Sequence, residues 1–246
     1  MTIAPERLLS ASTSRTSLRV AVNFGNVALA RKDAESGKLE GVSIELAKAL
    51  SSHVNLPLDY VAYPSAGKVV DAAEHDEWDI AFLAFDLSRQ DHLTFSPPYA
   101  FLEATFVVCD TDPYQSSAEL DVPGVKLSVT RNAAYELYLR DRFQRAEMLH
   151  AATPAESLDR FVNEDLHAAA GIRQALDKFA ATSPKFRVLS DSFLSIRQCI
   201  ATRKHTPDVG SLVADFMDAL KSRGLPKTMF DEARRSGVKL SFMNSS

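Results

Sequence analysis

The chain has very few of the residues that hold metals or form disulfide frameworks. Its 246 residues include only two cysteines, Cys109 and Cys199, which stand ninety positions apart. That separation fits neither a metal-ligand spacing nor a disulfide framework, so we expect two buried thiols that behave as small apolar side chains. None of the six histidines lies three or four positions from another. A zinc site is therefore not predicted, and no cofactor is expected.

Long hydrophobic runs are also missing. No stretch reaches the ~18 consecutive apolar residues that a membrane-spanning helix requires. The start of the chain, MTIAPERLLSASTSRTS, contains only the adjacent pair Leu8 and Leu9, where a secretory signal needs ~7 to ~15 apolar residues. The sequence as written is therefore expected to stay in the cytoplasm. A chain whose signal had been removed would instead act in the periplasm.

Positive charge is not in excess, because the formal net charge at pH 7 is −4. Without a global positive field, neither nucleic acid nor an anionic membrane surface is an expected partner. The composition is that of an ordinary globular protein, with 46% hydrophobic and 24% charged residues. A chain of this length can form one large domain or two smaller ones.

The first part of the chain alternates between two hydrophobic periods. Residues 18–24 (LRVAVNF), 56–63 (LPLDYVAY) and 78–85 (WDIAFLAF) are typical of strands. Between the first two, GVSIELAKALSSH has its apolar residues at helical spacing, and a further helix is expected around residues 68–74. Strands that alternate with helices predict an α/β fold with a mostly parallel sheet.

Two adjacent prolines, Pro97 and Pro98, interrupt this pattern. Proline cannot donate to a sheet ladder, so a strand interior is excluded at these positions. Residues 99–109 are then expected to be extended, a second alternation of strands and helices follows, and residues 194–204 (LSIRQCIATRK) are extended again. Two extended crossings predict two lobes.

The expected domain limits follow from these crossings. We expect residues 18–98 and 199–246 to form a first, discontinuous lobe. Residues 99–198 would hold the hinge strands and the second lobe. Residues 1–17 are expected to be a disordered leader, and residues 244–246 to be poorly ordered.

Several segments resemble one protein family in order and spacing. GKLEGVSIELAKAL, WDIAFLAFDLSRQDHLTFSPPY, VPGVKLSVTRNAAYELYL, SLDRFVNEDLHAAAG and DSFLSIRQCIATRK are similar to successive parts of type 2 periplasmic solute-binding proteins, the amino-acid-binding family 3 of ABC importers. The resemblance runs from about Leu18 to Phe230. It implies the type II periplasmic-binding-protein-like fold, in which two lobes are joined by two hinge crossings and close over a ligand. Each lobe is a mostly parallel sheet flanked by helices.

Arg89 is the first candidate site residue. In the family that the chain resembles, the arginine six residues before the Phe-Ser pair grips the ligand's carboxylate, and Arg89 stands six residues before Phe95. A guanidinium meets a carboxylate with two parallel charge-assisted hydrogen bonds. Open α/β sheets also bind ligands beyond the carboxyl ends of their strands. The alternative is a solvated arginine in a polar turn beside Gln90 and Asp91.

The segment that leads to this arginine departs from the family pattern, because it is shorter and has FDLS in place of Thr-Ile-Thr. Ser88 and Asp86 are therefore the candidates for the hydroxyl and acceptor roles. Phe24 and Phe85 are candidate aromatic platforms, although an aromatic residue beside a strand end is more often part of the core. Asn26, close after Phe24, completes the candidates in the first lobe.

The second lobe departs further. TRNAA replaces the family's Gly-Thr or Gly-Ser turn, so Arg131, Asn132 and Ala133 are the candidates there, although Arg131 can equally be a solvated residue. The amides at the following helix start can still face an anion. Where relatives carry an acidic residue for the ligand's ammonium group, this chain has Ala170. Because a buried ammonium without a partner is costly, we expect a carboxylate or dicarboxylate rather than a standard α-amino acid.

Three functional classes remain open. The first, which we favour, is a solute-binding protein that delivers a small anionic molecule to an ABC permease or senses it. The second is an enzyme on the same fold, a dehydratase of a cyclic carboxylate such as prephenate or arogenate, with Glu164, Asp165 and His167 as candidate acids. No Ser-His-Asp, Cys-His or phosphate-loop pattern supports this alternative. The third is a sensing or partner-binding module that no longer meets a transporter.

Overall fold

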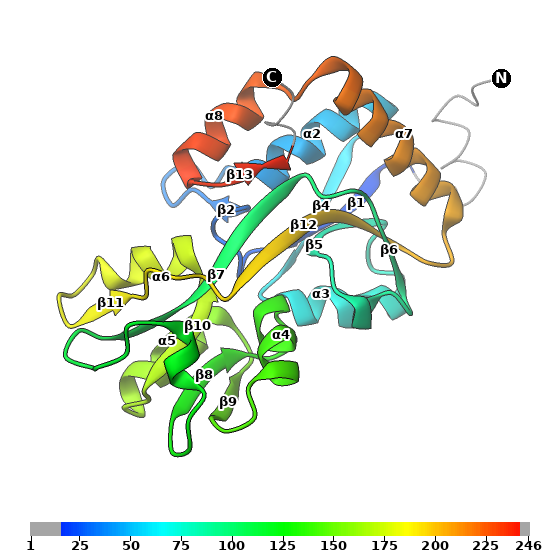
Figure 1. Cartoon of the computed structure of the whole chain (residues 1–246). Coiled ribbons are helices and arrows are strands. Elements are labelled where there is room, and N and C mark those ends of the chain that lie inside the picture. The colour runs from blue at the N-terminus through cyan, green and yellow to red at the C-terminus, as the bar shows by residue number, and fades with distance from the viewer. Residues whose placement is uncertain (1–15, 242–246) are drawn as a thin grey trace. The chain divides into compact units, whose positions relative to one another are not determined.

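The computed structural model describes residues 16–241, which divide into two compact units (Figure 1). Two long strands, β7 (Ala100–Cys109) and β12 (Leu194–Arg203), each pass from one unit into the other. Of the described residues, unit 1 holds 16–63, 68–101 and 197–241, and unit 2 holds 64–67 and 102–196. The disorder expected for residues 1–17 and 244–246 concerns positions that lie almost entirely outside the described residues.

Unit 1 is built on a sheet whose first three strands are parallel. β1 (Leu18–Asn23) lies between β4 (Leu58–Tyr63) and β5 (Ile80–Ala84). On the other side of β5, β12 runs antiparallel and also pairs with the short strand β6 (Leu93–Phe95). All five residues of β5 are buried, as expected for a strand of an α/β sheet covered on both faces.

Three helices of unit 1 pack together. α2 (Val42–Val54) packs against both of the late helices, α7 (Pro207–Arg223) and α8 (Lys227–Ser236). α2 begins after Gly41, which has a φ of 128° and lies so close to the carbonyl group of Leu29 that a side chain would collide with it. Only glycine therefore fits at this helix start. Other short elements of the unit include η1 (Ala73–His75), β2 (Arg31–Lys32), β3 (Leu39–Glu40), β13 (Lys239–Leu240) and most of α3 (Ala66–Ala72).

Unit 1 also buries an ion network at the amino edge of its sheet. Asp79, directly before β5, accepts hydrogen bonds from the backbone N–H of Arg19 at 2.9 Å and from Arg19 Nη2 at 2.8 Å. Arg203, the last residue of β12, places Nη2 3.8 Å from the same carboxylate and also pairs with Asp76. Asp79 is 3% exposed and Arg203 4%. These charges tie β1, β5 and β12 together at one edge.

Unit 2 repeats the α/β pattern with smaller elements. β8 (Lys126–Thr130) lies between β9 (Glu147–Ala151) and β10 (Ala168–Ile172) and is parallel to both. β10 pairs antiparallel with β7, which pairs in turn with β11 (Phe186–Val188). The helices are α4 (Ala134–Arg142), α5 (Pro154–Asn163) and α6 (Arg173–Ala180), and a 3-10 turn, η3, spans Ser117–Leu120.

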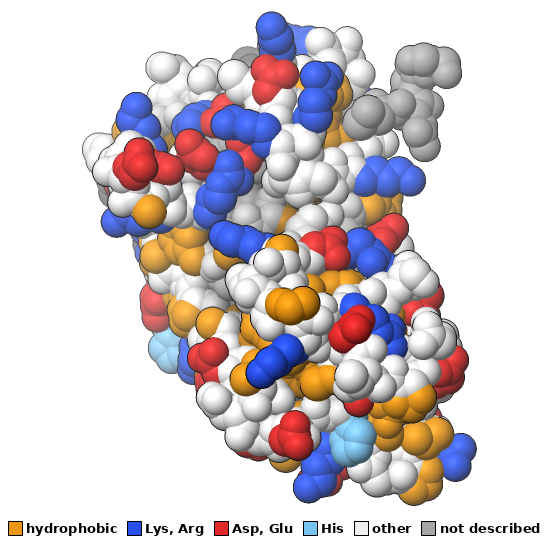
Figure 2. Space-filling model, turned by 90° about the vertical axis from the view of Figure 1, so that its left-hand side faces the viewer, with side chains coloured by type: hydrophobic (Ala, Val, Ile, Leu, Met, Phe, Trp, Pro, Cys, Tyr) orange, Lys and Arg blue, Asp and Glu red, His pale blue; other side chains and the backbone are white. Residues whose placement is uncertain are grey.

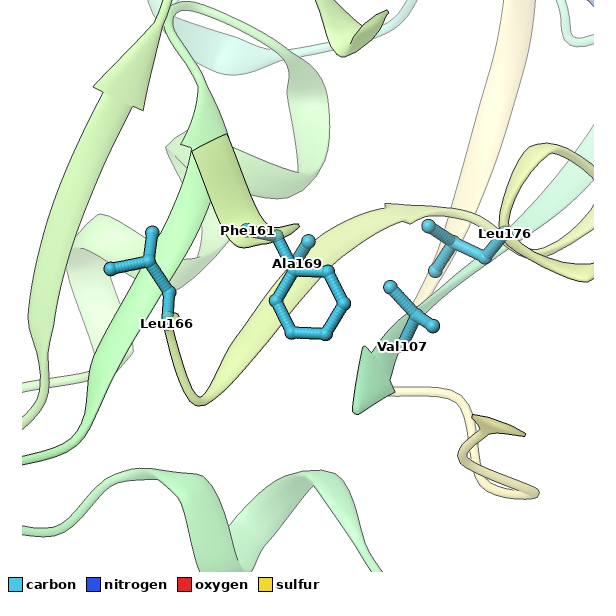
Figure 3. Close-up of a cluster of buried hydrophobic side chains, with 5 residues drawn as sticks. All are labelled: Val107, Phe161, Leu166, Ala169 and Leu176. Carbon is cyan, nitrogen blue, oxygen red and sulfur yellow. The ribbon is translucent and has the colours of Figure 1, made fainter. Parts of the chain in front are cut away.

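The core of unit 2 contains an apolar cluster of Val107, Phe161, Leu166, Ala169 and Leu176 (Figure 3). Figure 3 shows the Phe161 ring, which comes from α5, in the middle of the cluster. Burying a phenylalanine side chain contributes ~1.5 to ~3 kcal/mol, so this ring is a main contributor to the packing of α5 on the sheet. The interior of this cluster is therefore held by hydrophobic contact, without charged groups.

The fold class expected from the sequence is confirmed, with β1, β4 and β5 at the three predicted strands. Pro97 and Pro98 lie between β6 and β7, outside any strand. The extended segment FRVLS, also expected from the sequence, contains the short strand β11. The helix α8 and the short strands β2, β3, β6 and β13 were not expected, because such short strands depend on their partners rather than on a hydrophobic period. One expectation was wrong. Cys199 is buried, but Cys109, at the end of β7, is partly exposed.

On the face drawn in Figure 2, Lys and Arg side chains are interspersed with Asp and Glu rather than gathered into a block of one sign. No helix within residues 16–241 is long and apolar enough to cross a bilayer. Over the same residues, no group of three or more His, Cys, Asp or Glu side chains is arranged to hold a metal ion.

Candidate ligand-binding site

The candidate residues of unit 1 follow two neighbouring parallel strands. One set follows β1 and the other follows β5. Because the carboxyl ends of adjacent parallel strands meet at the same edge of a sheet, the structure brings both sets to the edge where open α/β sheets bind ligands. The set after β1 is Phe24 and Asn26, and the set after β5 is Phe85, Asp86, Ser88 and Arg89.

Arg89 is the most buried polar residue of these sets. It ends the 3-10 turn η2 (Leu87–Arg89) and is only 4% exposed. Its Nη1 donates a hydrogen bond of 2.7 Å to the carbonyl oxygen of Ala84, the last residue of β5. This bond fixes the orientation of a guanidinium that has five N–H donors in all. The alternative of a solvated arginine in a polar turn is therefore excluded.

Asp86 and Ser88 satisfy each other within this turn. Asp86 caps η2, and its Oδ1 accepts hydrogen bonds from the backbone N–H of Ser88 at 2.9 Å and from Ser88 Oγ at 2.6 Å. This arrangement is the usual one for an aspartate at a helix start. In the structure both residues shape the turn that carries Arg89, and a direct contact of either with a ligand stays a prediction.

The two aromatic candidates have different surroundings. The Phe85 ring packs edge-on against Phe95, with centroids 5.4 Å apart, and lies beneath the guanidinium of Arg197 at 4.3 Å. It is thus already part of a stack of side chains within unit 1. Phe24 is half-buried, and its backbone N–H donates to the carbonyl oxygen of Tyr63.

Asn26 carries a polar atom that the described part of the chain leaves without a hydrogen-bond partner. Its carbonyl oxygen accepts from the backbone N–H groups of Leu29 and Ala30, but its buried side-chain Oδ1 accepts from none of the described residues. Buried polar atoms are normally paired, so this oxygen is suited to accept a hydrogen bond from a ligand or from water.

The candidate residues of unit 2 also lie along two adjacent parallel strands. Arg131, Asn132 and Ala133 follow β8, and Ala170 lies in β10, in register with Phe106 of β7. Arg131 is exposed, whereas Ala133 and Ala170 are buried. The structure thus places these four residues in one part of unit 2.

Glu136, in the first turn of α4, was not a candidate from the sequence, but its carboxylate binds the turn after β8. The side chain is 1% exposed, and its Oε2 accepts from the backbone N–H of Asn132 at 3.0 Å. Asn132 has a left-handed φ of 59°. The Glu136 Oε1 lies 3.0 Å from His150 Nε2 and 3.9 Å from Arg140 Nη1. The anion that this amide faces is therefore the chain's own carboxylate.

The neighbouring backbone N–H groups of this turn also donate hydrogen bonds within the chain. The N–H of Arg131 donates to the carbonyl oxygen of Ala151, and that of Ala133 donates to Thr130. The sequence offered one signal for Glu136. It is an acidic residue in the first turn of a predicted helix, where its carboxylate can accept a hydrogen bond from a backbone N–H that precedes the helix. Beside it, burial raises the pKa of Tyr135 to about 12, so this phenol stays uncharged at neutral pH.

The three residues proposed for an enzyme all precede β10, at the amino end of that strand. Glu164 pairs with Arg160 on the surface at 2.6 Å. His167 Nδ1 accepts a hydrogen bond of 3.1 Å from the backbone N–H of Lys126. Asp165 sits in the left-handed turn between α5 and β10, with a φ of 52°. None of the three is at the strand end where ligands bind to this type of sheet.

Comparison with known proteins agrees with this architecture. The two α/β units connected by β7 and β12 define the class of two-lobed periplasmic binding proteins with the type II fold. Residues 18–232 match the model of the bacterial extracellular solute-binding proteins, family 3, and the chain belongs to that family. No curated protein sequence matches the chain.

Solved structures of similar fold cover nearly the whole chain. A mutant of ArgBP from T. maritima is 17% identical, with a TM-score of 0.78, and the match covers 94% of this chain and 99% of ArgBP. AbpA from Streptococcus pneumoniae, bound to L-arginine, is 20% identical, with a TM-score of 0.77 and coverage of 92% and 98%.

A third similar structure is that of the ancestral amino acid-binding protein AncCDT-1, a precursor of cyclohexadienyl dehydratase. It is 22% identical to this chain, with a TM-score of 0.76 and coverage of 92% and 98%. At these identities, the three likenesses show the fold alone.

Proposed function

We propose that this protein is a solute receptor that binds a small carboxylate-bearing metabolite, with Arg89 as the cation that holds the carboxylate. It would serve an ABC permease or act as a sensor, in the periplasm if the family role is retained. The observation that carries the proposal is the position of Arg89, which is 4% exposed and anchored to the carbonyl of Ala84 beyond the carboxyl end of β5. Arginine in such a place suits bidentate recognition of a carboxylate.

The two units favour a ligand without an ammonium group. Unit 2 has Ala170 at the position for an acidic partner, so a buried ammonium there would be costly. The carboxylate of Glu136 already occupies the Asn132 amide, which disfavours a second anion beside that turn. A carboxylate of the ligand is thus expected on unit 1, and the rest of the ligand is expected to carry no ammonium group.

A thermal-stability screen of the full chain tests this proposal. The panel contains standard amino acids and, for each, the matching 2-oxo acid and 2-hydroxy acid, together with dicarboxylates and cyclic acids. A ligand present at a hundredfold excess over its dissociation constant adds ~2.7 kcal/mol of stability, which raises the Tm of a chain of this size by several degrees. We expect stabilisation by one or more acids that lack the ammonium group, and none by their amino-acid counterparts.

Two arginine variants sharpen the screen. Arg89→Lys keeps the charge and loses the planar fork, so we expect the ligand-induced shift to fall strongly, whereas Arg160→Ala, on the surface of α5, is expected to keep it. Each shift is measured from the variant's own Tm without ligand. A full shift in Arg89→Lys, or stabilisation by amino acids only, would contradict the proposal. If chromatography shows that the protein consumes a stabilising acid, the dehydratase alternative would be favoured.

A further inference from the structure

Unit 1 contains a cavity of about 500 Å³ between the segment that follows β5 and the strand β12. Its apolar lining includes Phe85, Leu93, Phe95 and Cys199. This volume lies within the range of ~300 to ~1,000 Å³ that is typical of pockets for small molecules. The cavity therefore has room for an organic molecule with one or two rings.

The charged residues that line this cavity are all positive. Arg197 and Lys204 both line it, and no acidic residue does so within the described chain. The Arg197 guanidinium lies 4.3 Å from the centre of the Phe85 ring, and no described carboxylate forms an ion pair with it. Other arginines of the chain, such as Arg19 and Arg173, are paired with acids. A guanidinium held on an aromatic face still presents its N–H edge to an anion.

The acidic groups of this region face a different hollow. A neighbouring hollow of about 540 Å³ is lined by Glu74, Asp91, His92 and His205, and Lys204 lies between the two. In that hollow, His92 Nδ1 stands 3.5 Å from Glu74 Oε1. The Lys204 Nζ donates only a long hydrogen bond, of 3.3 Å, to the carbonyl oxygen of Gln90. The cavity beside Arg197 thus keeps a net positive lining of its own.

This cavity is separate from the carboxylate site proposed above. Arg89 does not line it, and the polar bonds of Asp86 and Ser88 are made within their own turn. The shared residue is Phe85, whose ring is packed against Phe95 and Arg197. The aromatic ring first considered as a platform for the main ligand is therefore better placed to contact a molecule in this cavity.

We propose that the cavity is a second binding site, for an aromatic carboxylate. The ring of the ligand would lie among Phe85, Leu93 and Phe95. The carboxylate would accept hydrogen bonds from Arg197 and Lys204. Small-molecule sites combine apolar surface with a few placed polar groups. Here five of the ten lining residues are apolar, and the two charged ones, Arg197 and Lys204, are both cations.

An NMR titration of the ¹⁵N-labelled full chain with 2-naphthoate tests this site. The amide signals of Phe95, Cys199 and Lys204 report on the cavity, and naphthalene-2-methanol is the neutral probe of equal shape. We expect 2-naphthoate to shift these signals and to bind about tenfold or more tightly than the alcohol, the difference expected for a charge-assisted hydrogen bond.

Variants separate the two sites. In Arg197→Gln, and independently in Lys204→Met, the affinity for 2-naphthoate should fall about tenfold, while Arg89→Lys should keep the wild-type value. Loss of binding in Arg89→Lys but not in Arg197→Gln would overturn the proposal, because the probe would then occupy the main site. Equal binding of acid and alcohol would also overturn it, as would unmoved cavity signals at about 10 mM 2-naphthoate, where even weak binding is visible.

Discussion

The two units share an α/β plan but hold a buried carboxylate at different edges of their sheets. In unit 1, Asp79 and Arg203 lie at the amino edge of the sheet, and the candidate ligand residue Arg89 lies at the carboxyl edge. In unit 2, the buried carboxylate of Glu136 accepts a hydrogen bond from the backbone N–H of Asn132, two residues beyond the carboxyl end of β8. The core cluster of unit 2 around Phe161 is apolar throughout.

Only in unit 1 do the buried ion network and the candidate ligand residue lie at opposite edges of the sheet. Asp79 and its two arginine partners stabilise unit 1 without occupying the carboxyl edge of the sheet, where the candidate residue Arg89 lies. Unit 2 uses a carboxylate to hold the turn Thr130–Ala133, so the same residue stabilises the turn and sets the charge beside it. The comparison teaches that two units of similar topology can hold a buried carboxylate at opposite ends of their parallel strands.

The largest effect is expected from breaking the ion network of unit 1. Asp79→Asn leaves Arg19 and Arg203 without a buried counter-charge, and removing one partner of a buried pair costs ~3 to ~5 kcal/mol of the free energy of unfolding. Urea unfolding, with hydrogen exchange of β1 and β5, measures the loss. Asp76→Asn is the matched control, because it meets the same two arginines but its side chain is 54% exposed. Its expected cost is below ~1 kcal/mol, and equal losses in the two variants would show that burial does not decide the effect.

A smaller effect is expected in unit 2. Glu136→Ala removes the carboxylate that accepts from the Asn132 N–H, and the loss of such a partner lowers the free energy of unfolding by ~1 to ~3 kcal/mol. The Asn132 amide should also exchange its hydrogen faster. Glu147→Ala, at an exposed position in β9, is the control and should change stability by no more than ~0.5 kcal/mol. If the Asn132 amide keeps its exchange rate in Glu136→Ala, the carboxylate does not hold the turn.

The smallest effect is expected in the reactivity of the two thiols, one in each unit. Burial raises the pKa of both, for Cys199 to about 12, and Cys199 is 2% exposed whereas Cys109 is partly exposed. At pH 8, iodoacetamide should therefore label Cys109 well before Cys199, as followed by peptide mass spectrometry.

The same shift predicts a loss of stability at alkaline pH. The neutral Cys199 thiol is favoured in the folded state, so its contribution is fully present below its ordinary pKa of about 9 and is lost as the pH rises from 9 towards 12. Cys199→Ala should flatten this part of the stability profile, whereas Cys109→Ala should change it less. Labelling of Cys199 as fast as Cys109 in the folded protein would contradict both expectations.

Much of the fold was predictable because it depends on neighbours in the sequence. The alternation of hydrophobic periods indicated the α/β class, and the strands β1, β4 and β5 appear where that pattern predicts them. Pro97 and Pro98 end the first alternation for a local reason, since proline cannot donate a backbone hydrogen bond. Arg89 was selected from its spacing to Phe95 and is found at the carboxyl edge of β5, while its contact with a ligand stays a prediction.

The rest depended on which distant residues the sheets bring together. Arg19 and Asp79 are sixty positions apart, and only the parallel pairing of β1 with β5 joins them. The antiparallel pairing of β12 with β5 likewise brings Arg197 over Phe85 and opens the cavity beside them. Sequence by itself determined most of the longer elements, their order and the family, because periodicity and motif spacing are local properties. The tertiary structure alone decided which charges are paired and buried, because these depend on strand register across the chain.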